Sequence, residues 1–440
     1  MEPHIWEEVL RRTKAVADEA EVYAMTSVQT PVKFEANRLK QIETRETSGV
    51  ALRLIVNGRI GFASTTNLDN LQVLVDNALA VASYGSEAKF TFPEVANHTP
   101  IPVYDPALAT SSVEKMVEAG QWLIDRVRSY HSDILGYATL RKELSSVDIV
   151  NSRGGGAHYS RSALTVGVDA NWVRGTDILD VWEEEESCRI GLNYQAIADR
   201  IVEKIRLAEE TVPTPTGQLP VIFTPKGVVS ALLAPLQMAF NGRNVLEGAS
   251  PLRDKLNQRV FSPALTLYDD GRVADVPTSA PCDGEGVPTR CTPLIEQGVV
   301  RSFFYDLQTA GLAGAQSTGN GRRTLPIAPK PLPNAWIVSP GNVSYEDMLA
   351  DVREGLLVDQ VMGAWAGNVL SGDFSGNVHL GYRIQNGKLV GRVKDTMVAG
   401  NIFKALDDLA AIGDEAAWVG GVHVQTPHLY FRALGVASKS

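Results

Sequence analysis

A short stretch near the C-terminus, SGDFSGNVHLGYRIQNGKL (371–389), contains the residue types of a nucleophilic enzyme site. Serine, histidine and aspartate form catalytic triads, which are defined by geometry and not by order along the chain. No G-x-S-x-G turn is present to expose a serine nucleophile. The alternation of apolar residues instead predicts a half-buried strand, with His379 on its polar side and Asp373 and Ser375 in the turn before it. We therefore predict no catalytic residue here.

The sequence also gives little support for a metal site. Among the seven histidines, only His423 and His428 lie close together, and Pro427 between them prevents a helix. In a strand, residues five apart point to opposite faces. The three cysteines (Cys188, Cys282 and Cys291) form no C-x-x-C pair, and no H-E-x-x-H motif is present. We therefore predict that this chain holds no metal.

Other polar segments fit turns or surfaces as well as sites. CDGEGVPTR (282–290) contains Asp283 and Glu285, and paired carboxylates serve acid–base catalysis or cation binding. Asp and Gly are also the usual turn residues, so we predict a tight turn. STGNGRR (317–323) offers backbone N–H groups and two arginines for a carboxylate or phosphate. We predict a solvated run for EEEE (183–186) and a hairpin turn for RGGG (153–156).

The elements of the first half predict a mixture of helices and hairpins. We expect a helix over 1–18, and Asn57-Gly58 predicts a hairpin between two β-rich runs. A second helix is expected from a cap at Asp69 to Gly85. Four prolines in 86–110 indicate a linker. We expect a helix over 111–130, strands over 134–185, and a helix within 193–210.

The proline-rich segment TVPTPTGQLP (211–220) predicts a domain boundary near residue 215. After it come an apolar strand, an apolar helix over 226–240, and β-rich segments with helices only near 344–356 and 401–411. We predict an α+β fold, with an N-terminal mixed α/β region followed by a strand-rich C-terminal domain. The predicted domains are 1–85, 111–215 and 219–440, with a linker at 86–110.

Composition narrows the function classes. The 440 residues are 44% hydrophobic, enough for a sizeable core, and carry 41 Lys+Arg against 51 Asp+Glu, a net charge of −10. This balance, without a dense basic tract, gives no reason to expect nucleic acid or an anionic membrane as a partner. No signal peptide or membrane span is recognisable. We therefore expect a soluble, cytoplasmic protein.

Several C-terminal segments together resemble one family. They are DGEGVPTRCTPLIEQGVVRSFFYDLQTA, STGNGRR, VSPGNVSYEDMLADVREGLLV, the stretch 371–389 and VKDTMVAGN. Their order and spacing across 219–440 resemble the TldD/PmbA family, also called TldD/TldE. The N-terminal segment VKFEANRLKQIETRETSGVALRLIVNGRIGFAST is similar to the family too. The resemblance therefore covers nearly the whole chain.

This resemblance implies a peptidase for unstructured peptides that is built from two related chains. The TldD-type chain carries H-E-x-x-x-H on the helix that opens the C-terminal domain, and a cysteine ligand near its C-terminus. Here the corresponding helix contains no histidine or cysteine, its nearest acid is Glu247 beyond the helical pattern, and the last cysteine is Cys291. The chain thus resembles the zinc-less PmbA (TldE) type, with zinc expected only in a TldD-type partner.

The resemblance also implies that the chain shapes a peptide groove without breaking bonds. The groove residues that we predict are Asp373, Ser375, His379, Gly381, Asp283, Glu285, Ser317, Thr318 and Gly319. Glycines such as Gly381 let another backbone approach, and an exposed strand edge could pair with a peptide. Two alternatives stay open: a stand-alone homodimer that binds peptide, and catalysis by Asp283, Glu285 and His379. The expected partners are a zinc-bearing TldD-type subunit or a second copy, and an unfolded peptide.

Overall fold

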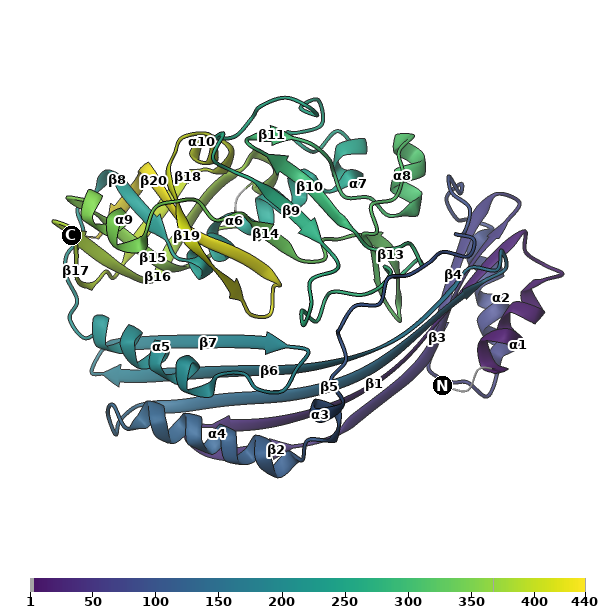
Figure 1. The fold of residues 1–440 in the computed structure, drawn as a ribbon, viewed down its shortest axis with the longest axis horizontal. Coiled ribbons are helices and arrows are strands. Elements are labelled where there is room, and N and C mark those ends of the chain that lie inside the picture. Colours follow the sequence, from purple (N-terminus) through teal and green to yellow (C-terminus); the bar gives the residue numbers. More distant parts are fainter. Residues whose placement is uncertain (1–3, 367, 440) are drawn as a thin grey trace.

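The computed structural model describes residues 4–366 and 368–439, which form two large sheets and a small hairpin. Figure 1 shows a long curved sheet from the first half of the chain, with the second half lying along one side of it. We call these the N-terminal sheet and the C-terminal region. Helices and strands alternate irregularly in both halves, which confirms the predicted α+β class.

The N-terminal sheet has seven antiparallel strands in the order β4-β3-β1-β5-β6-β7, with β2 also paired to β1. β1 pairs with β5 from Glu21–Asn151 to Phe34–Ala138, so the sheet spans both predicted N-terminal domains. The strands are β1 (Glu19–Glu35), β2 (Arg38–Ile42), β3 (Arg45–Val56), β4 (Arg59–Thr65), β5 (Leu135–Asn151), β6 (Gly156–Arg174) and β7 (Asp177–Ser187).

Local turn chemistry in this sheet follows the sequence. Asn57 and Gly58 have φ of 49° and 72° and form the predicted turn between β3 and β4. The RGGG segment joins β5 to β6, as predicted. The short runs expected before residue 35 are instead one strand, β1, of 17 residues. Pro31 is tolerated inside it because β3 stops pairing at Gln29 and β2 starts at Val32, so no ladder bond on that side requires its missing N–H.

Five helices accompany the N-terminal sheet: α1 (His4–Thr13), α2 (Leu71–Ala82), α3 (Pro106–Thr110), α4 (Val113–Arg128) and α5 (Tyr194–Leu207). The first is shorter than the predicted 1–18, of which residues 1–3 lie outside the described part of the chain. Asn70, and not Asp69, caps α2, which ends at Ala82 with Ser83 as its C-cap, before Gly85. α4 and α5 confirm the two later predictions and pack in one core with β5, β6 and β7.

The C-terminal region has an eleven-stranded sheet in which five strands close into a ring. The ring runs β20-β18-β16-β15-β8 and returns to β20, because β8 pairs with both β15 and β20. The strands are β8 (Gly217–Phe223), β9 (Leu267–Asp270), β10 (Cys291–Glu296), β11 (Val299–Val300), β14 (Trp336–Val338), β15 (Glu354–Met362), β16 (Asp373–Gln385), β17 (Lys388–Arg392), β18 (Thr396–Asn401), β19 (Leu409–Val419) and β20 (Val424–Ser438). A separate hairpin joins β12 (Gly321–Thr324) and β13 (Ile327–Pro331).

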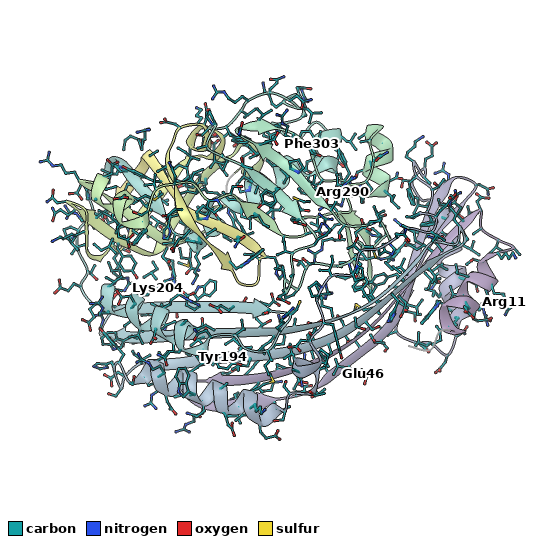
Figure 2. The ribbon with its side chains drawn as sticks, in the orientation of Figure 1. Arg11, Glu46, Tyr194, Lys204, Arg290 and Phe303 are labelled. Atoms are coloured by element: carbon teal, nitrogen blue, oxygen red, sulfur yellow. The ribbon has the colours of Figure 1, made fainter. Side chains whose placement is uncertain are left out.

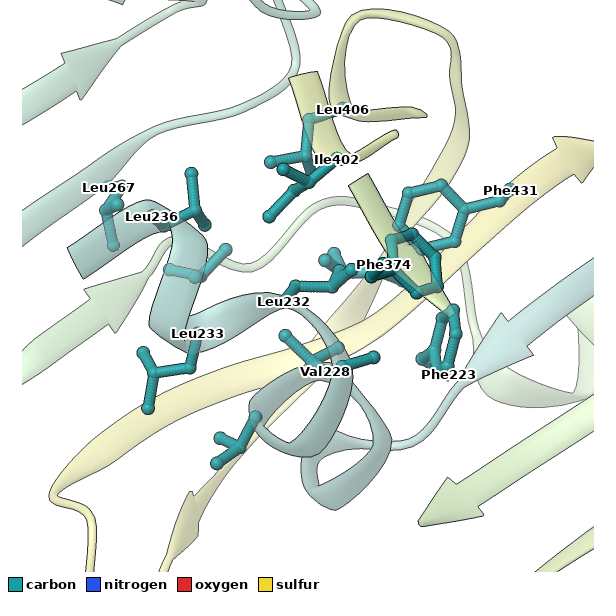
Figure 3. Packing of buried hydrophobic residues seen from close by; sticks show 14 of the residues in the cluster. Phe223, Val228, Leu232, Leu233, Leu236, Leu267, Phe374, Ile402, Leu406 and Phe431 are labelled. Carbon is teal, nitrogen blue, oxygen red and sulfur yellow. The ribbon is translucent and has the colours of Figure 1, made fainter. Parts of the chain in front are cut away.

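The predicted apolar helix is α6 (Pro225–Phe240), and it lies at the centre of the C-terminal core. Thr224 caps it, and Pro225 fits its first turn, where no N–H is needed. Figure 3 shows Leu232 pointing toward Phe374 and Phe431, while Leu233 points away from them. The remaining helices are α7 (Gly242–Leu246), α8 (Leu307–Ala313), α9 (Tyr345–Asp351) and α10 (Ile402–Asp407), with a 3-10 turn η1 (Val369–Ser371).

The helices expected over 344–356 and 401–411 are shorter than predicted, because β15 begins at Glu354 and β19 at Leu409. None of the helices formed by the described residues is both long and apolar enough to span a lipid bilayer.

Candidate functional site

The predicted site residues lie in separate parts of the C-terminal region. Asp373 and Ser375 belong to β16 itself, not to a turn before the strand as predicted, and both are exposed. The Asp373 carboxylate accepts hydrogen bonds from Asn401 Nδ2 at 2.9 Å and Ser371 Oγ at 2.8 Å, and these bonds lower its pKa. This carboxylate therefore ties the start of β16 to η1 and to the end of β18.

His379 and Gly381 lie farther along β16. The His379 side chain is on the polar side of the strand, as predicted, with Nε2 3.5 Å from Asp180 Oδ2 on β7. Gly381 is buried, and a Cβ atom there would lie 2.6 Å from Val378 Cγ1 and 3.0 Å from the Leu357 carbonyl oxygen. The space beside Gly381 is thus filled by the protein's own sheet and leaves no room for a second backbone.

Asp283 and Glu285 lie in the predicted tight turn, and both are buried. Asp283 Oδ1 accepts from the Glu285 and Val287 N–H groups, as turn aspartates do, while Oδ2 accepts from Gly321 N. Glu285 accepts from Arg53 on β3 and from Leu307 N at 2.7 Å. Burial raises the pKa of both carboxyl groups.

The STGNGRR loop lies beside this turn. Thr318 Oγ1 bonds to the Tyr305 backbone, Ser317 O accepts from Arg290, and Gly319 O accepts from Asn334 Nδ2 at 3.1 Å. Of the predicted site residues, the structure therefore brings together the 283–285 and 317–319 groups. Asp373, Ser375 and His379 occupy other places on β16.

A cavity of about 640 Å³, which we call the central cavity, lies at the boundary of the two halves. β7 lines one side of it, and the N-terminus of α6 together with β19 and the start of β20 lines the other. Its charged and aromatic lining residues are Glu183, Glu184, Glu185, Glu186, Arg200, Lys204, Lys226, Asp275, Asp359, Trp418, His423 and His428. The prediction that EEEE is a solvated run was wrong, because Glu183 is buried and the other three are partly buried at this cavity.

Two lysines connect the halves at the central cavity. Lys204 Nζ lies 2.6 Å from Glu183 Oε1 and 2.7 Å from Asp359 Oδ2. Figure 2 shows Lys204 on α5, facing the C-terminal region. Lys226 Nζ lies 3.7 Å from the centre of the Trp182 ring and donates to the Trp182 carbonyl oxygen. Burial lowers the pKa of Lys226, which is the response expected of a desolvated ammonium group.

His423 and Glu186 face each other across the same cavity, with Nδ1 and Oε2 3.6 Å apart. Burial, together with the nearby Arg322 and Arg161, lowers the pKa of His423 to about 4. Burial raises the pKa of Glu186. At neutral pH the imidazole is therefore uncharged and can donate or accept one hydrogen bond at each nitrogen.

The outer edge of β7 faces the C-terminal region. Lys226 donates to the Trp182 carbonyl oxygen and Arg392 Nη2 to the Ile178 carbonyl oxygen at 3.0 Å. In an antiparallel ladder every second residue points its backbone groups to the same edge, so those of Glu184 and Glu186 also point outward. Gly420 packs against the Glu184 carbonyl oxygen, which would lie 2.3 Å from a Cβ atom at that glycine. Among the described strands, β7 pairs only with β6.

The site residues that sequence reasoning missed come from distant segments: 183–186, 226, 359 and 423–428. The clustered glutamates and the two close histidines were visible, but nothing local showed that they face one cavity. Across residues 4–366 and 368–439, no three His, Cys, Asp or Glu side chains are grouped to hold a metal ion.

Comparisons with known proteins are consistent across sequence and structure. Residues 216–438 match the family model described as PmbA/TldA metallopeptidase C-terminal domain, and residues 20–82 match PmbA/TldA metallopeptidase domain 1. An uncharacterized protein of Methanocaldococcus jannaschii is 24% identical over 402 residues, covering 90% of this chain and 92% of that protein. A metalloprotease TldD homolog of Haemophilus influenzae is 25% identical over 440 residues, covering 92% and 88%.

Solved structures resemble the whole chain. The crystal structure of TldE from Thermococcus kodakarensis has a TM-score of 0.89 at 25% identity, covering 99% of this chain and 100% of that one. A putative modulator of DNA gyrase from Thermotoga maritima also has a TM-score of 0.89, at 22% identity and 99% coverage of both chains, and shows the same fold.

Proposed function

Because the chain belongs to the PmbA/TldD metallopeptidase family, we propose that it is a TldE-type subunit without zinc, which helps a zinc-bearing TldD-type partner to degrade or mature unstructured peptides. In this proposal the chain contributes scaffold and part of a peptide groove, while the partner breaks the bond. The chain works in the cytoplasm as a dimer, with the partner or, when alone, with a second copy.

The observation that carries this proposal is the composition of α6. A catalytic zinc ion takes three protein ligands from His, Cys, Asp or Glu side chains. α6 contains none of these residue types, and its buried positions are glycine, proline and aliphatic or aromatic side chains. The donor set on this helix does not fit zinc, so no step of the chemistry is assigned to a metal on this chain.

We place the peptide path in the central cavity and not beside Asp373 and Ser375. The volume of about 640 Å³ lies within the usual range for ligand sites. On the outward edge of β7, the backbone groups of Ile178, Trp182 and Glu184 already contact Arg392, Lys226 and Gly420. The Glu186 backbone and the charged side chains of the lining are therefore the groups that contact the peptide. Asp373, by contrast, already uses its carboxylate to hold Ser371 and Asn401.

The test is reconstitution with a purified TldD-type chain and an unfolded peptide. We expect turnover from the pair, none from this chain alone, and no stoichiometric zinc in this chain by elemental analysis. Glu184→Arg, which places a long cation in the central cavity, should reduce turnover by the pair. Glu203→Arg, at an exposed position on α5, is the matched control.

Three outcomes contradict the proposal. Peptide cleavage by this chain alone, abolished by His379→Ala, would make β16 an active site. One tightly held zinc per chain would contradict the assignment as a zinc-less subunit. A homodimer that binds peptide, with no gain on adding the TldD-type chain, would support the stand-alone alternative.

A further inference from the structure

A second cavity, of about 530 Å³, adjoins the central cavity at His423, which lines both. Its walls come from α6, from the hairpin β12–β13 and from the segment before β20. Leu233 is the α6 residue that Figure 3 shows pointing away from the phenylalanine core. The second cavity therefore lies on the face of α6 opposite Phe374 and Phe431.

The charge of the second cavity is opposite to that of the central cavity. Arg322, Arg323 and Lys330 line it, and the described lining includes no Asp or Glu. The central cavity is lined by six acidic and three basic side chains. In a chain with a net charge of −10, a cavity with only cationic charges is unexpected, because buried cations normally lie beside carboxylates.

Arg322 is the residue whose donors are left open. Its Nη1 donates to the Pro333 carbonyl oxygen at 2.9 Å, and no carboxylate among the described residues lies within ion-pair distance. Asp269, the acid whose charge acts on it, is buried and accepts from Asn320 and Asn334. A guanidinium has five N–H donors, so most of those on Arg322 have no acceptor among residues 4–366 and 368–439.

One further lining residue has an unused buried donor. Trp336 is 2% exposed, and its Nε1 has no hydrogen-bond partner in the described part of the chain. The Arg323 guanidinium, by contrast, lies over the Tyr23 ring, 4.6 Å from its centre, and its Nη1 pairs with Glu21, so it belongs to the contact with the N-terminal sheet. Buried donors without acceptors are costly, and a bound acceptor removes that cost.

We propose that the second cavity binds a carboxylate of the peptide, either an acidic side chain or the C-terminal carboxylate, with Arg322 as the main contact. This deepens the proposed function and rests on it, since it adds a substrate preference to the peptide path. An arginine fork matches the two oxygens of a carboxylate, and a charge-assisted pair of this kind is strong when shielded from water. Trp336 and Leu233 supply apolar walls for the neighbouring part of the peptide.

The experiment uses the full chain and three labelled peptides that are unstructured and otherwise identical. One is neutral, with Gln at its centre and both ends blocked; one has Glu in place of Gln; and one keeps Gln but has a free C-terminal carboxylate. Fluorescence anisotropy should show that one or both charged peptides bind about tenfold more tightly than the neutral one, with the gain falling as salt is added. The two charged peptides distinguish the two sources of carboxylate.

Arg322→Gln should remove that gain and leave binding of the neutral peptide unchanged, with melting curves checking that it folds. Lys330→Gln, at an exposed lining position, should reduce the gain without risk to the core. Arg301→Gln, an exposed arginine paired with Glu296, is the matched control and should keep the gain.

Equal affinity for all three peptides would overturn this inference while leaving the proposed function intact. If the neutral peptide does not bind, titration with N-acetylglutamate amide separates the two proposals. Binding of that probe to the wild type but not to Arg322→Gln supports the carboxylate site even though the peptide path has failed. Absence of binding by every probe overturns the carboxylate site, and turnover by the reconstituted pair then decides the proposed function.

Discussion

His423 combines an unusual backbone with an unusual proton affinity. Its φ of 53° lies in the left-handed region, and its carbonyl oxygen accepts from Trp336 N at 3.1 Å. The pKa of His423 is lowered from the usual 6.5 to about 4 in the folded protein. Between these two pH values the histidine binds a proton in the unfolded chain but stays neutral in the folded protein. The contribution of neutral His423 to the free energy of unfolding, fully present at pH 7, is therefore lost as the pH falls from 6.5 to about 4.

We expect His423→Asn to remove part of this acid sensitivity, because Asn cannot titrate and tolerates positive φ. Relative to the wild type, this variant should gain at most about 3 kcal/mol of unfolding free energy at low pH and almost none at pH 7. Melting curves at pH 7 and pH 4.5 check this. His131→Asn, at an exposed histidine, should retain the wild-type loss. The raised pKa of Glu186 acts in the opposite direction, so the comparison must be made between variants and not from the wild type alone.

Gly381 tests packing within the C-terminal ring. A Cβ atom there would lie 2.6 Å from Val378 Cγ1 and 3.0 Å from the Leu357 carbonyl oxygen. We therefore expect Gly381→Ala to destabilise the fold by about 1–3 kcal/mol through overpacking. Gly435→Ala is the control, since its Cβ would meet only ordinary contacts at 3.4 and 3.6 Å. Equal unfolding free energies for the two variants would contradict this.

At the scale of elements, α5 is joined to both halves by Lys204. The ammonium contacts Glu183 on β7 and Asp359 on β15, whose side chains are 8% and 3% exposed. Lys204→Met would leave two buried carboxylates without this partner, and breaking such a pair costs about 3–5 kcal/mol. Chemical denaturation should show that loss, with partial recovery in Lys204→Met/Asp359→Asn.

Arg206→Met on the same helix is the control for Lys204. The Arg206 side chain is 61% exposed and pairs with Glu203. Its replacement should therefore lower the free energy of unfolding by less than about 1 kcal/mol. A Lys204→Met variant that is no less stable than Arg206→Met would mean that the ion pairs contribute nothing net.

Most elements could be predicted because their signals are local. The Asn57-Gly58 turn, the caps and the apolar periods of α4, α5 and α6 depend on neighbouring residues. The lengths of the helices were less predictable. The predicted helices over 344–356 and 401–411 end early as α9 and α10, because their last predicted residues belong to the strands β15 and β19. The role of the EEEE segment could not be read locally, since Lys204 and Asp359, which hold Glu183, are distant in the chain.

At the scale of the whole molecule, a buried network joins the N-terminal sheet to the C-terminal region. Arg53 on β3 pairs with Glu21 and Glu285, and Arg323 pairs with Glu21 at 2.7 Å. The Arg53 guanidinium also lies 4.8 Å and 5.0 Å from the ring centres of Phe90 and Phe92. One side chain therefore holds both halves and the segment between α2 and α3.

We expect Arg53→Met to loosen all three parts together. Limited proteolysis should cut the segment around Phe90 faster than in the wild type, and stability should fall by about 3–5 kcal/mol because two buried carboxylates lose a partner. Arg45→Met, on the same strand with a 65% exposed side chain, should change neither. Unchanged cleavage in Arg53→Met would show that the segment is held by other contacts.

The α+β class and the family were within reach of the sequence, whereas the layout of the sites was not. Ordered motifs persist along a chain, so the resemblance was visible across almost its full length. The central cavity needs β7, α6, β15 and β20 to meet, and the pairing of β1 with β5 depends on burial between segments more than a hundred residues apart. Asp283 and Glu285 illustrate this, since their sequence fits a turn and only the fold shows Arg53 beside them.

The ring of the C-terminal region also constrains how the protein is made. β8, its first strand, pairs with β20, which ends at Ser438, and β20 also pairs with β14, β18 and β19. On the ribosome, the N-terminal sheet can assemble once β7 has emerged, but the ring has to wait for the last strand. Until then α6, with its many apolar side chains, has no closed core, and such long-range closure is slow. The second half of the newborn chain therefore exposes apolar surface for longer than the first half does.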